Sequence, residues 1–159
     1  PDAALLVVGE GPGLAALQAR VARNHLYGKV VLAGRVPHAD IPDYLAAMDV
    51  TAAPYIAHGA FYFSPLKVVE SLAAGRPVVA PRLGQLSELL RDGVTGVLFK
   101  PGDRDEFVNR VLELLNDQPR LHKMGHAAAA AARADFSWEK VARRATDIML
   151  SLRQTESRR

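Results

Sequence analysis

The sequence predicts a three-layer α/β fold, in which a mainly parallel sheet of about five strands is followed by C-terminal helices. Five short apolar runs lack apolar–polar alternation, which is typical of strands buried on both faces. Segments with helical spacing separate the runs, and strands that alternate with helices form a parallel sheet covered on both sides. The runs cover residues 5–8, 30–33, 50–53, 77–80 and 96–99.

The helices between these runs are expected from apolar residues that recur every three or four positions. Each of the four stripes would place one apolar face of its helix against the sheet. The stripes consist of Leu14, Leu17, Val21 and Ala22; Tyr44, Leu45 and Met48; Leu66, Val69, Leu72 and Ala73; and Leu86, Leu89 and Leu90.

After residue 100 the pattern becomes wholly helical. Asp103 can cap a first helix, and Glu106 three residues later would complete a capping box. A second helix is expected from about Pro119 through the alanine run 127–132, and a third from Ser137. The inner face of the third helix would carry Trp138, Val141, Ala145, Ile148 and Met149.

The length and composition suit one globular domain, which we expect over residues 1–152 with a disordered tail over residues 153–159. The chain has no cysteine, which excludes disulfides, zinc–thiolate sites and thiol nucleophiles and suits a cytoplasmic enzyme. No apolar run of ~18 residues and no basic–apolar leader are found, so neither a membrane span nor a secretion signal is expected.

The net charge of +3 comes largely from basic residues late in the chain. Solvated helix faces would explain them, and so would contact with a membrane surface or an anionic ligand. Nucleic acid is not expected as a partner, because no aromatic residues are interleaved with the basic ones. These basic residues are Arg133, Lys140, Arg143, Arg144, Arg153, Arg158 and Arg159.

Glycines follow the first two predicted strands at their carboxyl ends, which is the edge where open α/β sheets bind ligands. Gly9 and Gly11 precede a helix start, whose free N–H groups could receive an anion. After the second strand, Gly34 is followed by Arg35, which could meet a phosphate or a surface acid, and by Val36, whose backbone could contact a nucleobase. Ordinary turn chemistry is favoured for the first segment, whereas the second is open between a functional role and a structural one.

The strongest candidate for a site is the helix start that follows the aromatic-rich loop 55–63. Ser64 is a good N-cap, and Pro65 fits the first helical position. Lys67 lies in the first turn, where a cation opposes the helix dipole and needs an anionic partner. A diphosphate would serve as that partner.

Glu70 lies one turn further along this helix and shares a face with Leu66 and Ala73. A carboxylate on an apolar face is unfavourable unless it is hydrogen-bonded, and the vicinal hydroxyls of a ribose would satisfy both of its oxygens. The alternative is a simple surface ion pair between Lys67 and Glu70.

Three further features have weaker functional interpretations. Gly84, after the fourth strand, would let a ligand approach the backbone closely. Glu88 is either an acid that favours a helix start or a ligand residue. His122 and His126 have the spacing of a metal pair, but no third ligand accompanies them, so a solvated helix face is favoured and no metal is expected.

Taken in order, these segments resemble the C-terminal domain of the family 4 glycosyltransferases, retaining enzymes with two Rossmann-like domains in the arrangement called the GT-B fold. The resemblance extends to about residue 150 and depends on an ordered set of short motifs. The motifs lie at residues 9–12, 34–36, 41–50, 54, 64–70, 74–80, 88, 92–98 and 136–138.

The resemblance implies transfer of a sugar from a nucleotide-diphosphate sugar, with retention of the anomeric configuration and with no metal or other cofactor. Glu70 matches the second glutamate of the family's Glu-x7-Glu pattern, which holds the ribose, and the backbone of residues 64–67 would lie near the diphosphate. Tyr62 stands where the family has its first glutamate, which contacts the donor sugar, so the chain would represent a subtype. No catalytic residue is assigned.

Family members also carry an earlier strand, which ends in a Gly-Arg motif followed by a lysine, and an acceptor-binding N-terminal domain. This sequence contains neither, so the chain is expected to be a fragment that is inactive alone. The absent strand would occupy the centre of the family's strand order, 3-2-1-4-5-6. We expect the sheet to close up to the order 2-1-3-4-5, because unpaired strand edges are unfavourable. A strand supplied by a partner chain is the alternative.

A non-catalytic module that binds a nucleotide, or docks a partner through its basic helices, is the alternative to an enzyme. A signalling receiver fits poorly, because Pro54 stands where such a protein needs a phosphorylatable aspartate. For the enzyme we expect a nucleotide-sugar donor, a cytoplasmic location and, as an option for the full-length protein, peripheral association with the inner membrane surface.

Overall fold

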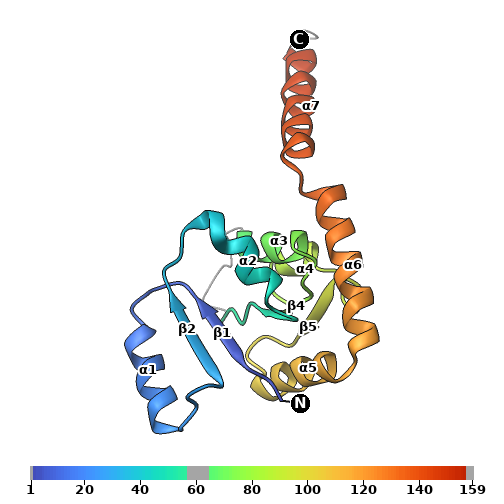
Figure 1. Ribbon diagram of the computed structural model, residues 1–159. Helices are drawn as coiled ribbons and strands as arrows, with labels where there is room; N and C mark the ends of the chain where they lie inside the picture. Colours follow the sequence, from blue (N-terminus) through green and yellow to red (C-terminus); the bar gives the residue numbers. More distant parts are fainter. Residues whose placement is uncertain (1, 57–64, 157–159) are drawn as a thin grey trace.

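The computed structural model describes residues 2–56 and 65–156 (Figure 1). The strands are β1 (Leu5–Val8), β2 (Val30–Gly34), β3 (Thr51–Ala52), β4 (Val78–Pro81) and β5 (Gly96–Phe99). The α-helices are α1 (Leu14–Arg23), α2 (Ile41–Ala46), α3 (Leu66–Ala73), α4 (Leu86–Leu89), α5 (Arg104–Asn116), α6 (Gln118–Asp135) and α7 (Trp138–Glu156), and a 3₁₀ helix, η1 (His38–Asp40), precedes α2.

The parallel sheet of β3, β4 and β5 forms the centre of the fold. Val78 of β4 lies opposite Thr51 of β3 and Gly96 of β5. Every residue of β4 and β5 is buried, as continuous apolar runs predict. The face that carries Val78 packs against α3, α4 and α6, and the face that carries Val79 packs against α5 and α6. The expected α/β fold with a parallel sheet, helices on both faces and C-terminal helices is therefore confirmed.

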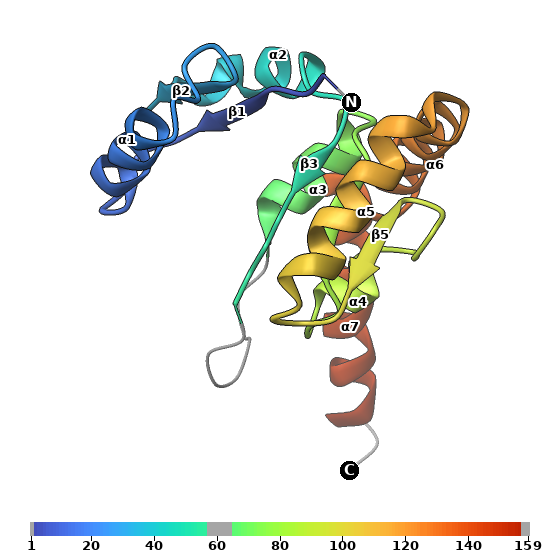
Figure 2. The ribbon, with the colours of Figure 1, turned by 90° about the horizontal axis from the view of Figure 1, so that it is seen from below.

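The strands β1 and β2 form a separate parallel pair, with Leu5 opposite Val30. Among residues 2–50, Val21 of α1 is the only buried residue, and Val31 of β2 is 52% exposed. The β1–α1–β2 unit therefore adds little to the main core. Figure 2 shows this unit standing apart from the group that contains β3 and β5.

The expected closure of the sheet to the order 2-1-3-4-5 is wrong. The described residues form two sheets, in the orders β1-β2 and β3-β4-β5, and β1 is not hydrogen-bonded to β3. The strand β3 consists only of Thr51 and Ala52, shorter than the run at residues 50–53 predicts. Pairing so short an edge would contribute only about 1–3 kcal/mol, which leaves little to draw the two units together.

Helix α3 begins at Leu66 rather than at Pro65. Pro65 occupies the cap position with φ −82° and ψ 73°, outside the helical region, although its carbonyl accepts the N–H of Val68 at 2.8 Å. The expected N-cap, Ser64, lies outside the described residues. The predicted end is confirmed, because Gly75 has a φ of 70°, which favours glycine.

The first two C-terminal helices form as expected. Asp103 caps α5, since its carboxylate accepts the backbone N–H of Glu106 at 2.9 Å. The reciprocal half of the capping box is not formed: the Glu106 carboxylate instead accepts the N–H of Lys100 at 2.8 Å. Helix α6 contains the alanine run and buries Ala128 and Ala132 against the sheet.

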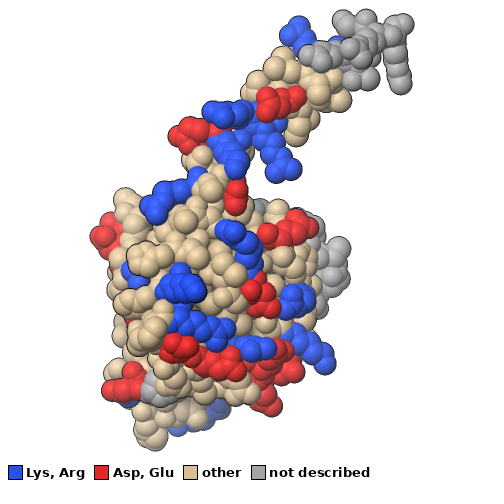
Figure 3. All heavy atoms as spheres, turned by 90° about the vertical axis from the view of Figure 1, so that its right-hand side faces the viewer, with Lys and Arg blue, Asp and Glu red and all other residues tan. Residues whose placement is uncertain are grey.

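The third C-terminal helix, α7, does not pack as expected. Its predicted inner face is exposed: Trp138 is 84% exposed, and Val141, Ile148 and Met149 are also exposed. Figures 1 and 3 show α7 projecting away from the rest of the molecule, with Lys and Arg side chains along it. The helix continues to Glu156, beyond the predicted domain end at residue 152. In the described part of the chain, no helix is long and apolar enough to span a bilayer.

Candidate functional site

The turns that follow β1 and β2 meet at the carboxyl edge of the strands. The N–H of Gly9 donates to the carbonyl of Gly34 at 2.8 Å. Gly9 has a φ of 124° and Gly34 a φ of 68°, conformations that favour glycine. A Cβ added at Gly9, Gly11 or Gly34 would meet no atom within 4 Å, so the space beside these turns is open. The structure thus brings together the glycines that the sequence analysis singled out.

Arg35 extends from the second of these turns towards Glu10 on the first. Its Nη1 lies 3.4 Å from the Glu10 Oε1, and its side chain is 81% exposed. Of the two interpretations of Arg35, the pairing with a surface acid is therefore the one found. An exposed pair of this kind contributes little stability, about 0–1 kcal/mol, so the guanidinium can exchange Glu10 for another anion. Val36 follows directly and is half-buried.

The start of α3 carries the most distinctive side-chain contact of this edge. The Lys67 Nζ lies 4.4 Å from the ring centroid of Tyr55, which follows β3. This cation–π contact joins the end of β3 to the first turn of α3. Burial lowers the pKa of the Lys67 ammonium and raises the pKa of the Tyr55 hydroxyl. An anion placed beside Lys67 would restore the preference for the charged ammonium.

Glu70 is half-buried and makes no hydrogen bond or ion pair with another described residue. The alternative of a surface ion pair between Lys67 and Glu70 is therefore wrong, because the Lys67 ammonium lies over Tyr55 instead. The apolar surroundings expected for Glu70 also differ. Leu66 is 68% exposed, since α3 is covered by β4 and α6 on the side of Val68 and Leu72. Glu70 is half-buried and lies beside that buried face.

Two expected site residues, Tyr62 and Ser64, lie outside the described residues, so their roles stay predictions. Pro65 and Leu66, which follow them, lie at the start of α3 as expected. Tyr55 was not singled out as a site residue. The aromatic-rich composition of the loop 55–63 is the sequence signal that could have found it.

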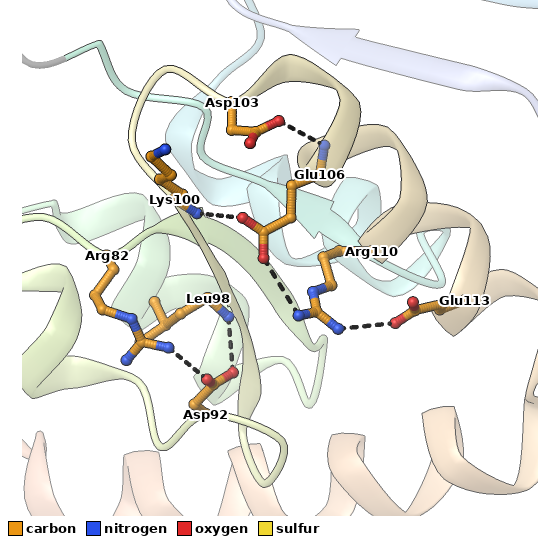
Figure 4. A network of polar contacts seen from close by, with 8 residues as sticks. All are labelled: Arg82, Asp92, Leu98, Lys100, Asp103, Glu106, Arg110 and Glu113. Carbon is orange, nitrogen blue, oxygen red and sulfur yellow. Dashed lines mark hydrogen bonds and ion pairs between the residues drawn. The ribbon is translucent and has the colours of Figure 1, made fainter.

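The loop after β4 is anchored at its first residue, Arg82, through both the backbone and the side chain. The Arg82 N–H donates to the Phe99 carbonyl at 2.7 Å, and Gly84 has a φ of 47°. The Arg82 guanidinium lies 2.7 Å from a carboxylate oxygen of Asp92, and the other oxygen accepts the N–H of Leu98 at 2.9 Å (Figure 4). Gly84 thus lies two residues after an anchored position, in a backbone conformation that favours glycine.

The second half of the polar network in Figure 4 attaches the end of β5 to α5. The Glu106 carboxylate, which accepts the N–H of Lys100, also pairs with Arg110 at 3.2 Å. Arg110 pairs further with Glu113 at 3.2 Å. The sequence predicted Glu106 only as a capping residue. Its contacts with Lys100 and Arg110 lie outside the capping-box pattern and could not be found from that pattern.

Within the described residues, no group of three His, Asp or Glu side chains is arranged to hold a metal ion. His122 and His126 are exposed on α6, as a solvated helix face predicts. Glu88 is exposed in the first turn of α4 and makes no side-chain hydrogen bond or ion pair with a described residue.

Comparison with known proteins identifies the family to which this chain belongs. Residues 1–117 match the family described as Glycosyl transferases group 1, and this chain belongs to that family. Its α/β architecture is the Rossmann-like fold of the GT-B glycosyltransferases.

Two similar proteins are mannosyltransferases. The chain is 33% identical over 157 residues to the GDP-mannose-dependent alpha-(1-6)-phosphatidylinositol monomannoside mannosyltransferase of Mycolicibacterium smegmatis, covering 97% of this chain and 41% of that protein. It is 33% identical over 159 residues to the lipopolysaccharide core biosynthesis mannosyltransferase LpsB of Rhizobium meliloti, covering 96% and 44%. The chain therefore spans less than half the length of these relatives.

Solved structures agree with this assignment. Anabaena Alr3699/HepE in complex with UDP has a TM-score of 0.82 and 28% identity, over 95% of this chain and 42% of that chain. Sucrose-phosphate synthase from Thermosynechococcus elongatus has a TM-score of 0.80 and 25% identity, over 95% and 39%. The C-terminal domain of LpcC from Francisella tularensis, at 18% identity and a TM-score of 0.70 over 85% and 70%, shares the fold alone.

Proposed function

We propose that this chain is the donor-binding half of a family 4 glycosyltransferase, which transfers a sugar from a nucleotide-diphosphate sugar with retention of configuration. The observation that carries the proposal is Glu70: a half-buried carboxylate without a partner among the described residues, at the border of α3 and one turn after Lys67. Among similar structures, Alr3699/HepE contains UDP or UDP-glucose, which supports a nucleotide-sugar donor.

In this proposal the diphosphate lies at the start of α3, beside Lys67 and the backbone of residues 64–67. The positive end of the helix dipole and the Lys67 ammonium both favour an anion there. The ribose hydroxyls donate to Glu70, and Tyr62, which lies outside the described residues, would take the role of the family's first glutamate. The open turns at Gly9, Gly11 and Gly34 to Val36, with the loop at Gly84, complete the edge around the nucleotide.

The remaining parts of the proposal concern the whole protein. No metal or other cofactor is required, because Lys67 and the helix start supply the positive charge. The acceptor would bind to an N-terminal domain, and the basic residues that neutralise the leaving diphosphate would follow an earlier strand of the donor-binding domain, so this chain alone would not turn over. Relatives named for phosphatidylinositol monomannoside act on a lipid, which supports a cytoplasmic enzyme working at the inner membrane surface.

A second candidate function, docking of a partner, is favoured by one observation. The apolar side chains along α7 are exposed, including Trp138 and Leu152. Docking through this face is compatible with donor binding, because α7 projects away from the start of α3 (Figure 1).

The proposal is tested by titrating the chain with UDP, GDP and ADP while recording ¹H–¹⁵N spectra. We expect one nucleotide to shift the amides of Lys67 and Glu70. Glu70→Gln should weaken its binding about tenfold, as loss of charged hydrogen bonds predicts. Glu139→Gln, an exposed glutamate on α7, is the matched control and should bind as the wild type does.

The 2′-deoxy form of the same nucleotide assigns the contact to the ribose. The wild-type chain should bind the 2′-deoxy form more weakly than the parent nucleotide. In Glu70→Gln the two nucleotides should have the same affinity, because both changes remove the same hydrogen bond. Shifts confined to other parts of the chain, or an unchanged affinity of Glu70→Gln, would remove Glu70 from the donor site.

A further inference from the structure

A surface groove lies at the opposite end of the central sheet from the candidate donor site. It has a volume of about 330 Å³, which is within the range of small-ligand sites. Its walls come from three places: Asp49 before β3, the turn 74–77 before β4, and one face of α6. The donor-site turns follow the carboxyl ends of the strands, whereas this groove lies at their amino ends.

The helix and the turn that form the groove are closely packed. A Cβ added at Gly125 of α6 would come within 2.6 Å of the Gly75 carbonyl oxygen, so helix and turn are in close backbone contact. Gly75 has a φ of 70°, and its N–H donates to Leu72 at 2.9 Å. The Arg76 N–H donates to Ser71 at 2.8 Å. These bonds occupy the last carbonyls of α3, which reduces the negative potential that a helix end otherwise presents.

Arg76 lies in this turn, and its side chain has no polar partner among residues 2–56 and 65–156. Its Nε is buried without a hydrogen bond, and no described residue forms an ion pair with its guanidinium. A buried donor that has lost water and gained no acceptor is unfavourable. The guanidinium is permanently charged and its fork of N–H groups matches a phosphate or a carboxylate.

Three titratable side chains share the groove with Arg76. His122 and His126 lie one turn apart on α6, on either side of Gly125, and Asp49 lines the same groove from the segment before β3. None of the three forms a hydrogen bond or ion pair with another described residue. They are not arranged as a metal site in the described part of the chain. The groove therefore combines guanidinium and imidazole donors with a carboxylate acceptor.

We propose that this groove binds a small phosphorylated polyol, at a site distinct from the donor site. The phosphate accepts hydrogen bonds from the Arg76 guanidinium and from the imidazoles of His122 and His126. A hydroxyl of the organic part donates to Asp49, whose carboxylate would repel a bare anion. The ligand thus supplies the acceptor that Arg76 lacks and the donor that Asp49 lacks.

The test uses inorganic phosphate, glycerol phosphate and glycerol as probes of the chain in ¹H–¹⁵N spectra. The amides of Gly75 and Gly125 report on the groove, and those of Gly9 and Lys67 report on the donor site. We expect glycerol phosphate to shift Gly75 and Gly125, with an affinity about tenfold above that of phosphate. Shifts at neither glycine, or at the donor site alone, would overturn the proposal.

Variants separate the two halves of the ligand. Arg76→Gln should weaken the binding of inorganic phosphate and of glycerol phosphate about tenfold. Arg104→Gln, which changes an exposed arginine on α5, is the matched control and should leave both affinities unchanged. Asp49→Asn should remove the advantage of glycerol phosphate over phosphate. If Arg76→Gln does not fold, the double variant His122→Gln, His126→Gln carries the same expectation. Equal affinity for the two probes, with no effect of Asp49→Asn, would overturn the polyol assignment.

A soluble ester and a lipid headgroup share this chemistry, so a parallel arm measures sedimentation with phosphatidylcholine vesicles that do or do not contain phosphatidic acid. Binding that needs phosphatidic acid and is lost in Arg76→Gln would assign the ligand to a lipid. Binding of glycerol phosphate without vesicle binding would assign it to a soluble ester.

Discussion

The Asp92 carboxylate joins three parts of the chain. One oxygen accepts the N–H of Leu98 in β5, and the other pairs with Arg82 after β4. Partial burial acts to raise the pKa of Asp92, but the hydrogen bonds from Leu98 and Arg82 and the charge of Arg82 outweigh it and hold the pKa below its usual value. The loop that presents Gly84 to the candidate donor site depends on this ionised group.

Because folding lowers the pKa of Asp92, its contribution to stability is present above the pKa of the unfolded chain and is lost as the pH falls through the folded value. We expect Asp92→Ala to lower the free energy of unfolding at pH 7 by about 1–2 kcal/mol, since it removes the acceptor of Leu98. Asp92→Asn keeps an acceptor for Leu98 and removes the ion pair with Arg82, which is largely exposed. It should therefore lower the free energy of unfolding by less than about 1 kcal/mol.

Urea denaturation at pH 7 and again at acid pH below the unfolded pKa measures both effects. The difference between wild type and Asp92→Asn should shrink at the lower pH, where the wild-type carboxyl is protonated in part. A difference that grows on acidification would contradict the role given to Asp92.

At the scale of elements, α3 and α7 have similar amphipathic patterns and different surroundings. Helix α3 buries Val68 and Leu72 against β4 and α6. Helix α7 has exposed apolar residues along its length, because no described element lies against it (Figure 1). Its contribution to the stability of this chain should therefore be small.

We expect the double variant Ile148→Ala, Met149→Ala to leave the free energy of unfolding within about 0.5 kcal/mol of the wild type, as for exposed positions in general. Leu114→Ala, at a fully buried position of α5, is the contrast and should cost about 2–5 kcal/mol. Urea denaturation followed by circular dichroism measures both. A loss in the double variant comparable to that of Leu114→Ala would mean that α7 packs on the body of the chain.

At the scale of the whole molecule, stability is divided unequally between the two sheets. All residues of β4 and β5 are buried, whereas no residue of β1 or β2 is buried. The β1–α1–β2 unit, which presents the turns at Gly9 and Gly34, is held by fewer buried apolar contacts than the sheet that presents α3. The candidate donor site therefore lies between two units of different stability.

Hydrogen exchange should detect this difference. Amides of β1 and β2 should exchange at least about tenfold faster than those of β4 and β5, because the N-terminal unit can open without unfolding the core. Peptides that contain Leu32 and Val79 provide the comparison by mass spectrometry. Equal protection of the two would mean that both sheets unfold together.

The features that follow from neighbouring residues could be predicted. The apolar runs locate all five strands to within a few residues, Asp103 caps α5, and Gly75 ends α3. The glycines at the carboxyl edge were also found, because each follows a strand directly. The contacts of Lys67 with Tyr55 and of Arg82 with Asp92 could not be found in this way, since each joins residues ten or more positions apart across separate elements.

The sequence by itself determined the strand and helix order, the caps, the likeness to the Glycosyl transferases group 1 family and the location of a candidate site at the start of α3. Only the tertiary structure decided that β1–β2 stays separate from β3–β4–β5, that α7 exposes its apolar face, and that Glu70 has no pairing with Lys67. The physical reason is the range of the forces involved. Periodicity and capping depend on residues within a turn of one another, whereas strand pairing, burial and ion pairing depend on which distant segments meet.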